Sequence, residues 1–129
     1  MTEPYLAIQA VMMPRDTNPH GSIFGGVLLS FIDQAGAIGA VRAVVAAGGA
    51  LPTVVTVAIN RVEFKQPVLV GDVVRFLTRV VRIGRTSITM HVAVEADRGT
   101  QVLQVTEAEL VYVGVDLTKP GRPPLPLLP

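Results

Sequence analysis

The sequence predicts an α+β fold, in which one long helix packs against an antiparallel sheet of five strands. Three observations predict this class. A long apolar segment lies between residues 22 and 47, a β-prone segment precedes it, and four more β-prone segments follow it. Strands joined by tight turns pair antiparallel. A helix of about 25 residues spans roughly 37 Å, which is long enough for a curved sheet to wrap.

The N-terminal part of the chain predicts a strand, a loop and the helix. Residues 6–13 are expected to form the strand, which Pro14 ends. Residues 15–21 are rich in Asp, Asn, Pro and Gly and predict a loop. Ser22 is the expected N-cap of the helix, and Gly48-Gly49 is its expected end. Because the helix is apolar almost all the way round, we expect it to be covered on most sides.

Four strands are expected after the helix. They cover residues 53–60 with an extension through 61–65, then 72–83, 86–96 and 101–115. Gly84-Arg85 and Asp97–Gly99 are the expected turns between the last three. Residues 1–116 are therefore expected to form a single domain. The Pro- and Leu-rich tail, 117–129, is expected to pack against it or to fray.

The composition excludes several classes of protein. The formal net charge is only +1, which argues against nucleic acid as the main partner. There is no cysteine, so disulfides, thiolate catalysis and cysteine-based zinc sites are excluded. Two histidines cannot alone make a His-rich metal site, and we expect neither a metal nor a cofactor. The first residues do not resemble a signal peptide, so the expected compartment is the cytoplasm.

The apolar content predicts a covered surface. Half of the residues are hydrophobic and 16% are charged, which favours a membrane or a large subunit interface. Residues 43–59 carry no charge and are long enough to span a membrane. However, Gly48-Gly49 and Pro52 interrupt them, so a helix end, a turn and a strand are expected there. We therefore expect a homo-oligomer and no membrane partner.

One acid stands out in the apolar helix. Asp33 is the only ionisable side chain between His20 and Arg42. Helical spacing places it on a stripe of small residues, with Gly26, Ser30 and Ala37. An acid in such surroundings costs free energy unless it is solvated, paired or functional. The alternative to a functional site is a helix-packing groove in which Asp33 pairs with an arginine.

The start of the helix offers hydrogen-bond donors. Gly25 and Gly26 leave backbone N–H groups accessible at the positive end of the helix dipole, where an anion or an oxyanion binds well. Two glycines alone can equally serve close packing. Combined with Asp33 two turns later, they suggest a carbonyl polarised by N–H groups and a carboxylate that activates water or attacks.

Polar residues elsewhere are weaker candidates. Asn18 and His20 lie in the loop before the helix and are able to bind a substrate carbonyl or water, although Asn before Pro is commonly a turn residue. The segment Arg82–Ser87 places two arginines and two hydroxyls around a glycine turn. Such a turn binds phosphate or is simply a solvated hairpin.

These segments together resemble the active-site region of hotdog-fold acyl-CoA thioesterases, in particular the acyl-CoA hydrolase group. The matching residues are Pro14-Arg-Asp-Thr-Asn18, His20-Gly21, Phe24-Gly25-Gly26 and Asp33, with later matches at 54–57, 64–72 and 84–87. The resemblance covers residues 6–115. One departure is Ser22, where the family often has an acidic or larger residue.

The resemblance implies a fold, an assembly and an activity. Two protomers are expected to join their sheets, with active sites between them, and three such dimers to form a hexamer. The expected reaction is hydrolysis of an acyl-CoA to CoA and a carboxylic acid. Asp33 is implied as general base or nucleophile. Asn18 is implied to orient water or substrate, from the other protomer, and the Gly26 N–H to polarise the carbonyl.

The same resemblance implies which residues bind the substrate and its CoA part. They are His20, Gly25, Thr56, Arg85, Thr86 and Ser87. Two alternatives stay open. One is a module that binds acyl-CoA without cleaving it, and the other is a dehydratase or hydratase, which would need a histidine base that the helix lacks. The sequence does not predict the acyl chain, the pathway, nucleotide regulation, or the roles of His20 and Ser22.

Overall fold

The computed structural model describes residues 3–129, which form one α-helix, a short 3₁₀ turn and five strands. In chain order these are β1 (Tyr5–Val11), η1 (Pro14–Asp16), α1 (Gly25–Ala46), β2 (Val54–Asn60), β3 (Val73–Ile83), β4 (Ser87–Asp97) and β5 (Val102–Gly114). The predicted class and the predicted set of five strands are confirmed.

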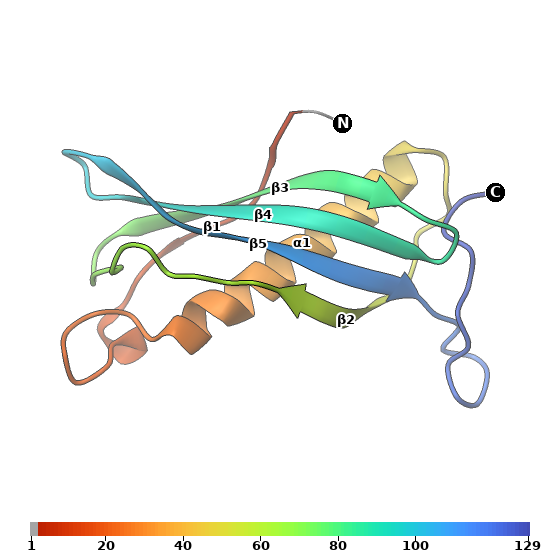
Figure 1. Ribbon diagram of the computed structural model, residues 1–129, viewed down its shortest axis with the longest axis horizontal. Coiled ribbons are helices and arrows are strands. Elements are labelled where there is room, and N and C mark those ends of the chain that lie inside the picture. Colours follow the sequence, from red (N-terminus) through yellow and green to blue (C-terminus); the bar gives the residue numbers. More distant parts are fainter. Residues whose placement is uncertain (1–2) are drawn as a thin grey trace.

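All neighbouring strands pair antiparallel, in the order β1-β3-β4-β5-β2. The helix lies diagonally across one face of this sheet (Figure 1). It connects β1 and β2, which are the two edge strands, and residues 61–72 return from β2 to β3. The helix is therefore the element that spans the width of the sheet, and its middle lies under the central strands.

The sheet covers one side of the helix and does not close around it. Eight helical residues are buried against the strands, among them Leu28, Ile32 and Val44. On the opposite side Ile38 and Val45 remain 42% and 48% exposed. The expectation that the helix is covered on most sides is therefore met on one side only within the single chain.

The helix begins later than expected, because Ser22 belongs to the loop. The Asn18 side chain bonds to the N–H and the hydroxyl of Ser22: its Oδ1 accepts the Ser22 N–H at 3.2 Å and its Nδ2 donates to Ser22 Oγ at 2.9 Å. The N-cap is Phe24, whose side chain forms no capping hydrogen bond. The prediction of Ser22 as N-cap is wrong, and the first helical N–H groups receive no side-chain cap.

The predicted extension of β2 through residues 61–65 is also wrong. β2 ends at Asn60, and Arg61 has a φ of 48°, in the left-handed region that breaks a strand. The segment then runs as a loop beside β5, where the Lys65 N–H donates to the Val105 carbonyl at 2.8 Å. This loop carries Phe64 toward the start of α1.

The expected end of the helix is confirmed. Gly48 has a φ of +95°, the left-handed conformation that commonly terminates helices. The N–H groups of Gly48 and Gly49 donate to the carbonyls of Val45 and Val44 at 3.1 and 2.9 Å. Residues 43–59 thus form a helix end, a turn and a strand, as predicted.

The helix α1 is long and apolar enough to cross a membrane, judged by length and composition alone. The core helix of a sheet-backed protein meets the same criterion, and 44% of the apolar window of α1 is buried inside the fold. The buried side of α1 accordingly has a partner in the sheet itself.

The C-terminal tail packs against the β3–β4 turn. Leu127 is only 4% exposed, and its N–H donates to the Arg85 carbonyl at 3.0 Å. The Leu125 N–H donates to the Gly114 carbonyl at 2.8 Å. A Cβ atom on Gly114 would lie 2.7 Å from Leu127 Cδ2, so glycine leaves the room that the leucine needs. The tail therefore packs against the domain and does not fray.

Candidate active site

Asp33 is held by two hydroxyl groups from the sheet. The Thr56 hydroxyl donates to Asp33 Oδ1 at 2.7 Å. The Tyr112 hydroxyl faces the same Oδ1 at 3.2 Å and the main-chain carbonyl of Asp33 at 2.8 Å. Within residues 3–129, no arginine or lysine forms an ion pair with Asp33. The alternative interpretation, in which Asp33 pairs with an arginine in a helix-packing groove, therefore does not describe the single chain.

The strand register explains why these two hydroxyls meet. Thr56 of β2 and Ile88 of β4 both pair with Tyr112 of β5, so the three residues form one row across the sheet. The β5 residues alternate between burial and exposure, and Tyr112 is fully buried on the side of the helix. Thr56 was expected to contact substrate, and in the structure its hydroxyl contacts the carboxylate.

Tyr112 is the site residue that sequence reasoning missed. Asp33 and Tyr112 are 79 positions apart, beyond the reach of any local pattern. A signal did exist, because the alternation of the last strand points Tyr112 inward and a buried tyrosine hydroxyl usually has a hydrogen-bond partner. Burial raises the pKa of Tyr112 far above its usual value, and the negative charge of Asp33 raises it further. The phenol is therefore a permanent donor.

The first N–H groups of α1 are open. Among the described residues no hydrogen bond is formed by the N–H of Gly25 or Gly26, whereas the Val27 N–H donates to the Phe24 carbonyl at 3.1 Å. A Cβ atom on Gly26 would meet nothing within 4 Å, so its backbone faces open space. Both predicted donors thus lack a hydrogen-bond partner among the described residues and lie at the positive end of the helix dipole.

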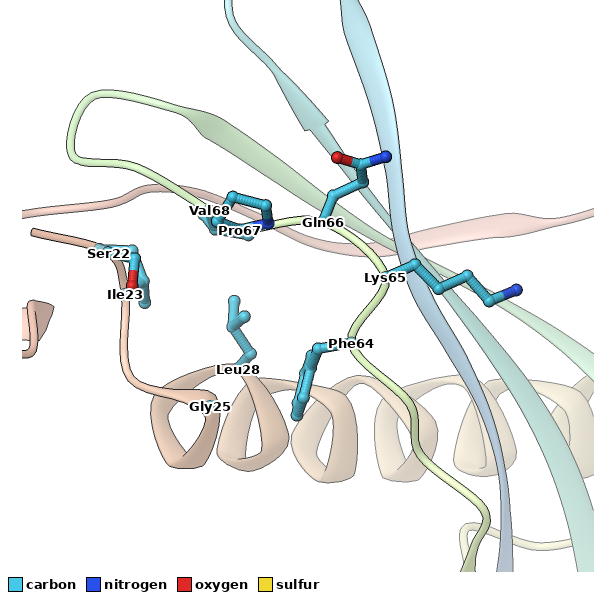
Figure 2. A pocket seen from close by; sticks show the side chains of 9 residues that line it. All are labelled: Ser22, Ile23, Gly25, Leu28, Phe64, Lys65, Gln66, Pro67 and Val68. Carbon is cyan, nitrogen blue, oxygen red and sulfur yellow. The ribbon is translucent and has the colours of Figure 1, made fainter. Parts of the chain in front are cut away.

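A small hollow of about 240 Å³ lies beside this helix start. Figure 2 shows the Phe64 ring pointing toward the helix near Leu28, while the Lys65 and Gln66 side chains point away from it. A Cβ atom on Gly25 would come within 3.2 Å of the Phe64 ring. Gly25 therefore lets the 61–72 loop close over the first turn, while the space beside Gly26 stays open.

An apolar groove of about 810 Å³ follows the exposed side of the same helix. It is lined by Tyr5, Ala37, Ile38, Val41, Arg42, Val45, Ala46 and Leu51. Ala37 is one helical turn after Asp33, on the predicted stripe of small residues. The carboxylate thus lies on the helix between the open N–H groups and the apolar groove.

Asn18 and His20 are not brought to Asp33 within the single chain. Asn18 Oδ1 accepts the His20 N–H at 2.8 Å, which makes Asn18 the centre of its own loop. Among residues 3–129, neither side chain forms a hydrogen bond with Asp33. The resemblance placed Asn18 opposite the aspartate of another protomer, and that expectation stays a prediction.

Three of the predicted substrate- and CoA-binding residues, Arg85, Thr86 and Ser87, lie at the β3–β4 turn. The Thr86 carbonyl accepts the Gly114 N–H at 2.8 Å, and Ser87 begins β4 immediately before Ile88. Ile88 pairs with Tyr112, and neighbouring strands lie about 4.8 Å apart. The turn is therefore at the end of the sheet nearest to Asp33. The Arg85 side chain is exposed and forms no ion pair with any described residue.

The described part of the chain contains no group of three or more His, Asp or Glu side chains arranged to hold a metal ion. The absence of a metal requirement nevertheless stays a prediction from the sequence.

Known proteins are similar to this chain in sequence and in fold. Residues 20–103 match the model of the thioesterase superfamily. The acyl-CoA thioester hydrolase YciA of Salmonella typhimurium is 41% identical over 128 residues, covering 95% of this chain and 90% of that protein. The hexameric thioesterase y2039 of Yersinia pestis superposes with a TM-score of 0.85 at 36% identity, covering 100% of this chain and 98% of that one.

A more distant neighbour has been solved both as the parent protein and as single-residue variants. The acyl-CoA hydrolase of Staphylococcus aureus, in complex with butyryl-CoA and CoA, has a TM-score of 0.74 at 26% identity, covering 92% of this chain and 70% of that one. Variants of that protein have been solved in which one aspartate or one asparagine is replaced by alanine. Those two positions are fifteen residues apart, which is also the separation of Asn18 and Asp33.

Proposed function

The chain belongs to the thioesterase superfamily, and we propose that it hydrolyses acyl-CoA thioesters to free CoA and a carboxylic acid. The observation that carries this proposal is a carboxylate, Asp33, held by two hydroxyls two turns after the open N–H groups of its helix. The names of the relatives supply the acyl-CoA class. The hotdog fold expected from the resemblance is confirmed by the structural neighbours.

Asp33 is proposed to act on a water molecule. Gly26 lies two turns before Asp33, roughly 10 Å along the helix axis, and helical side chains lean toward the N-terminus. This spacing leaves room for a water between the carboxylate and a thioester carbonyl bound at the Gly26 N–H. Asp33 takes a proton from the water while the water oxygen bonds to the carbonyl carbon. The carbonyl oxygen becomes negative near the N–H, and collapse of this intermediate breaks the C–S bond and releases CoA as a thiolate.

Direct attack by Asp33 is the alternative chemistry. A carboxylate oxygen would then bond to the carbonyl carbon, CoA thiolate would leave, and water would hydrolyse the resulting anhydride. In either case we propose that Asn18 of a neighbouring protomer orients the water or the substrate. The matched separation of Asn and Asp in the S. aureus hydrolase supports this pairing.

The CoA part is proposed to bind along the β3–β4 turn and the loop before α1. Arg85 supplies an exposed positive charge and Thr86 and Ser87 supply hydroxyls, which suit a phosphate. His20 and Gly25 line the approach from the loop side. We propose that residues 1–116 form the catalytic domain, that residues 117–129 hold the turn through Leu127, and that the enzyme needs no metal or cofactor and works in the cytoplasm.

The activity is tested by offering the purified protein short, medium, long and aromatic acyl-CoAs and measuring released CoA with a thiol reagent. We expect repeated turnover with at least one class, because the proposed groups act on the thioester itself. Tight binding without any thiol release would instead favour the module that holds acyl-CoA without cleaving it.

The assembly is proposed to be a homo-hexamer built as a trimer of dimers. The exposed apolar side of α1 and the unpaired edge of β2 offer surfaces for such contacts. The Y. pestis neighbour is hexameric by its description. Light scattering is expected to give six times the 13.7 kDa chain mass, with the dimer as the smallest species on dilution. A monomer that hydrolyses acyl-CoA at full rate would contradict an active site shared between protomers.

A further inference from the structure

The two oxygens of the Asp33 carboxylate have different surroundings. Oδ1 faces the Thr56 hydroxyl at 2.7 Å and the Tyr112 hydroxyl at 3.2 Å. Oδ2 accepts no hydrogen bond from any residue between 3 and 129. Because no side-chain oxygen without a partner is fully buried in the described part of the chain, Oδ2 is at least partly accessible to solvent. The sheet therefore holds one oxygen and leaves the other free.

Tyr112 reaches the helix because residue 36 is glycine. Gly36 is buried on α1, one turn after Asp33. A Cβ atom at this position would overlap the Tyr112 hydroxyl and would lie 3.0 Å from ring atom Cζ. Glycine inside a helix is unfavourable relative to alanine, so its presence here is matched to the tyrosine.

The hydroxyl of Tyr112 anchors both the backbone and the side chain of Asp33. Its distance to the Asp33 carbonyl oxygen is 2.8 Å, which joins the helix to β5 at the reactive residue itself. Because burial and the charge of Asp33 keep the Tyr112 pKa far above its usual value, the phenol stays protonated and donates. It cannot serve as the base of the reaction, and Asp33 keeps that role.

We propose that Tyr112 is a positioning residue that, together with Thr56, fixes Oδ1 of Asp33 and thereby makes Oδ2 the reacting oxygen. This inference rests on the proposed thioester hydrolysis. Tyr112 is fully buried between the sheet and the helix. It acts through the carboxylate, and Gly36 provides the space that allows it to do so.

The test is the variant Tyr112→Phe, which keeps the buried ring and removes only the hydroxyl. We expect kcat to fall about ten- to a hundredfold, the range for losing a hydrogen bond to a charged group, with KM within about twofold. In an Asp33→Asn background the same change is expected to lower the residual rate no further, because the tyrosine acts through Asp33.

Thr78→Val is the matched control. It also removes one buried hydroxyl that donates to a main-chain carbonyl, that of Tyr5 at 3.3 Å, but on β3, two strands away from Tyr112 of β5. We expect a similar loss of thermal stability and an unchanged kcat. An equal fall of kcat in both variants would overturn the positioning role, since it would reflect stability alone.

A second variant addresses the glycine. Gly36→Ala is expected to displace Tyr112 and to lower kcat as Tyr112→Phe does. Adding Tyr112→Phe to Gly36→Ala is expected to restore part of the lost melting temperature without restoring kcat, because the overlapping hydroxyl is gone. A fully active and more stable Gly36→Ala enzyme would show that the close approach does not matter.

The outcomes for the inference and for the proposed function are separable. A wild-type protein without thiol release would contradict the proposed function, whereas an active wild type with an equally active Tyr112→Phe variant would contradict only the positioning role. A crystal structure of Tyr112→Phe gives a readout independent of activity. We expect more than one rotamer for Asp33, and a single unmoved carboxylate would overturn the inference.

Discussion

Replacing Asp33 by asparagine is expected to lower kcat for acyl-CoA hydrolysis by about a thousandfold, within the range that a positioned general base contributes. Asparagine keeps the size of the side chain, and its carbonyl oxygen still accepts from Thr56 and Tyr112, which hold Oδ1 in the wild type. It cannot take a proton from water. The fold and KM are therefore expected to stay close to those of the wild type while turnover is lost.

The measurement compares thiol release by wild type, Asp33→Asn and Asp33→Ala at matched protein concentration, with the melting temperature of each. Asp116→Asn is the control for loss of one negative charge, since Asp116 immediately precedes the tail and its Oδ1 accepts the Thr118 N–H at 2.9 Å. We expect the control to retain full activity. If Asp33→Asn kept more than about a tenth of the wild-type rate, the general-base role would be wrong.

Removing Arg98 is expected to cost about 3–5 kcal/mol of unfolding free energy, the usual penalty for breaking a buried ion pair. Asp72 is only 3% exposed, and the Arg98 Nε lies 3.1 Å from its Oδ1. Arg98 also donates to the Pro67 carbonyl at 2.6 Å, and the Leu69 N–H donates to Asp72 Oδ2 at 2.9 Å. Arg98→Ala leaves the buried carboxylate without its cation.

Chemical denaturation of Arg98→Ala at a fixed protein concentration measures this loss, because subunit association also contributes to apparent stability. Arg61→Ala is the control. Its ion pair with Glu63 spans 3.5 Å between side chains that are 88% and 66% exposed, so less than about 1 kcal/mol is expected. Adding Asp72→Asn to Arg98→Ala should recover part of the loss. Equal shifts in both arginine variants would contradict the role of burial.

The same ion pair matters for the site. Pro67 and Leu69 belong to the loop that carries Phe64 against Gly25 at the start of α1. Loosening this loop disturbs the helix start without touching Asp33. The Asp72–Arg98 ion pair thus stabilises the start of α1, which carries the open N–H groups, from a position away from Asp33.

Local patterns were enough to predict the helix and the strands. The alternation of residues 86–96 and the glycines at 48 and 49 act over a few residues, and the structure follows them. Two predictions, Ser22 as the N-cap and Arg61 as part of a strand, are wrong because of local interactions that the pattern does not show. Asn18 uses its side chain to hold Ser22 in the loop, and Arg61 adopts a left-handed conformation that β-propensity does not reveal.

The features that the sequence does not predict depend on contacts between residues far apart in the chain. Asp33 was singled out because a lone acid in an apolar helix is costly, but its partners come from β2 and β5, and no spacing rule joins them. The strand order was not predicted, and only that order places Thr56 beside Tyr112 in front of the helix. Gly36 likewise has meaning only once Tyr112 is seen against it.

The most direct measurement is a product balance for the wild-type protein incubated with excess acyl-CoA. Hydrolysis predicts one free CoA thiol and one carboxylic acid for every acyl-CoA consumed, over many turnovers per protomer. Recovery of intact acyl-CoA, bound in stoichiometric amounts and never cleaved, would contradict the assignment of Asp33 as the group that drives thioester hydrolysis.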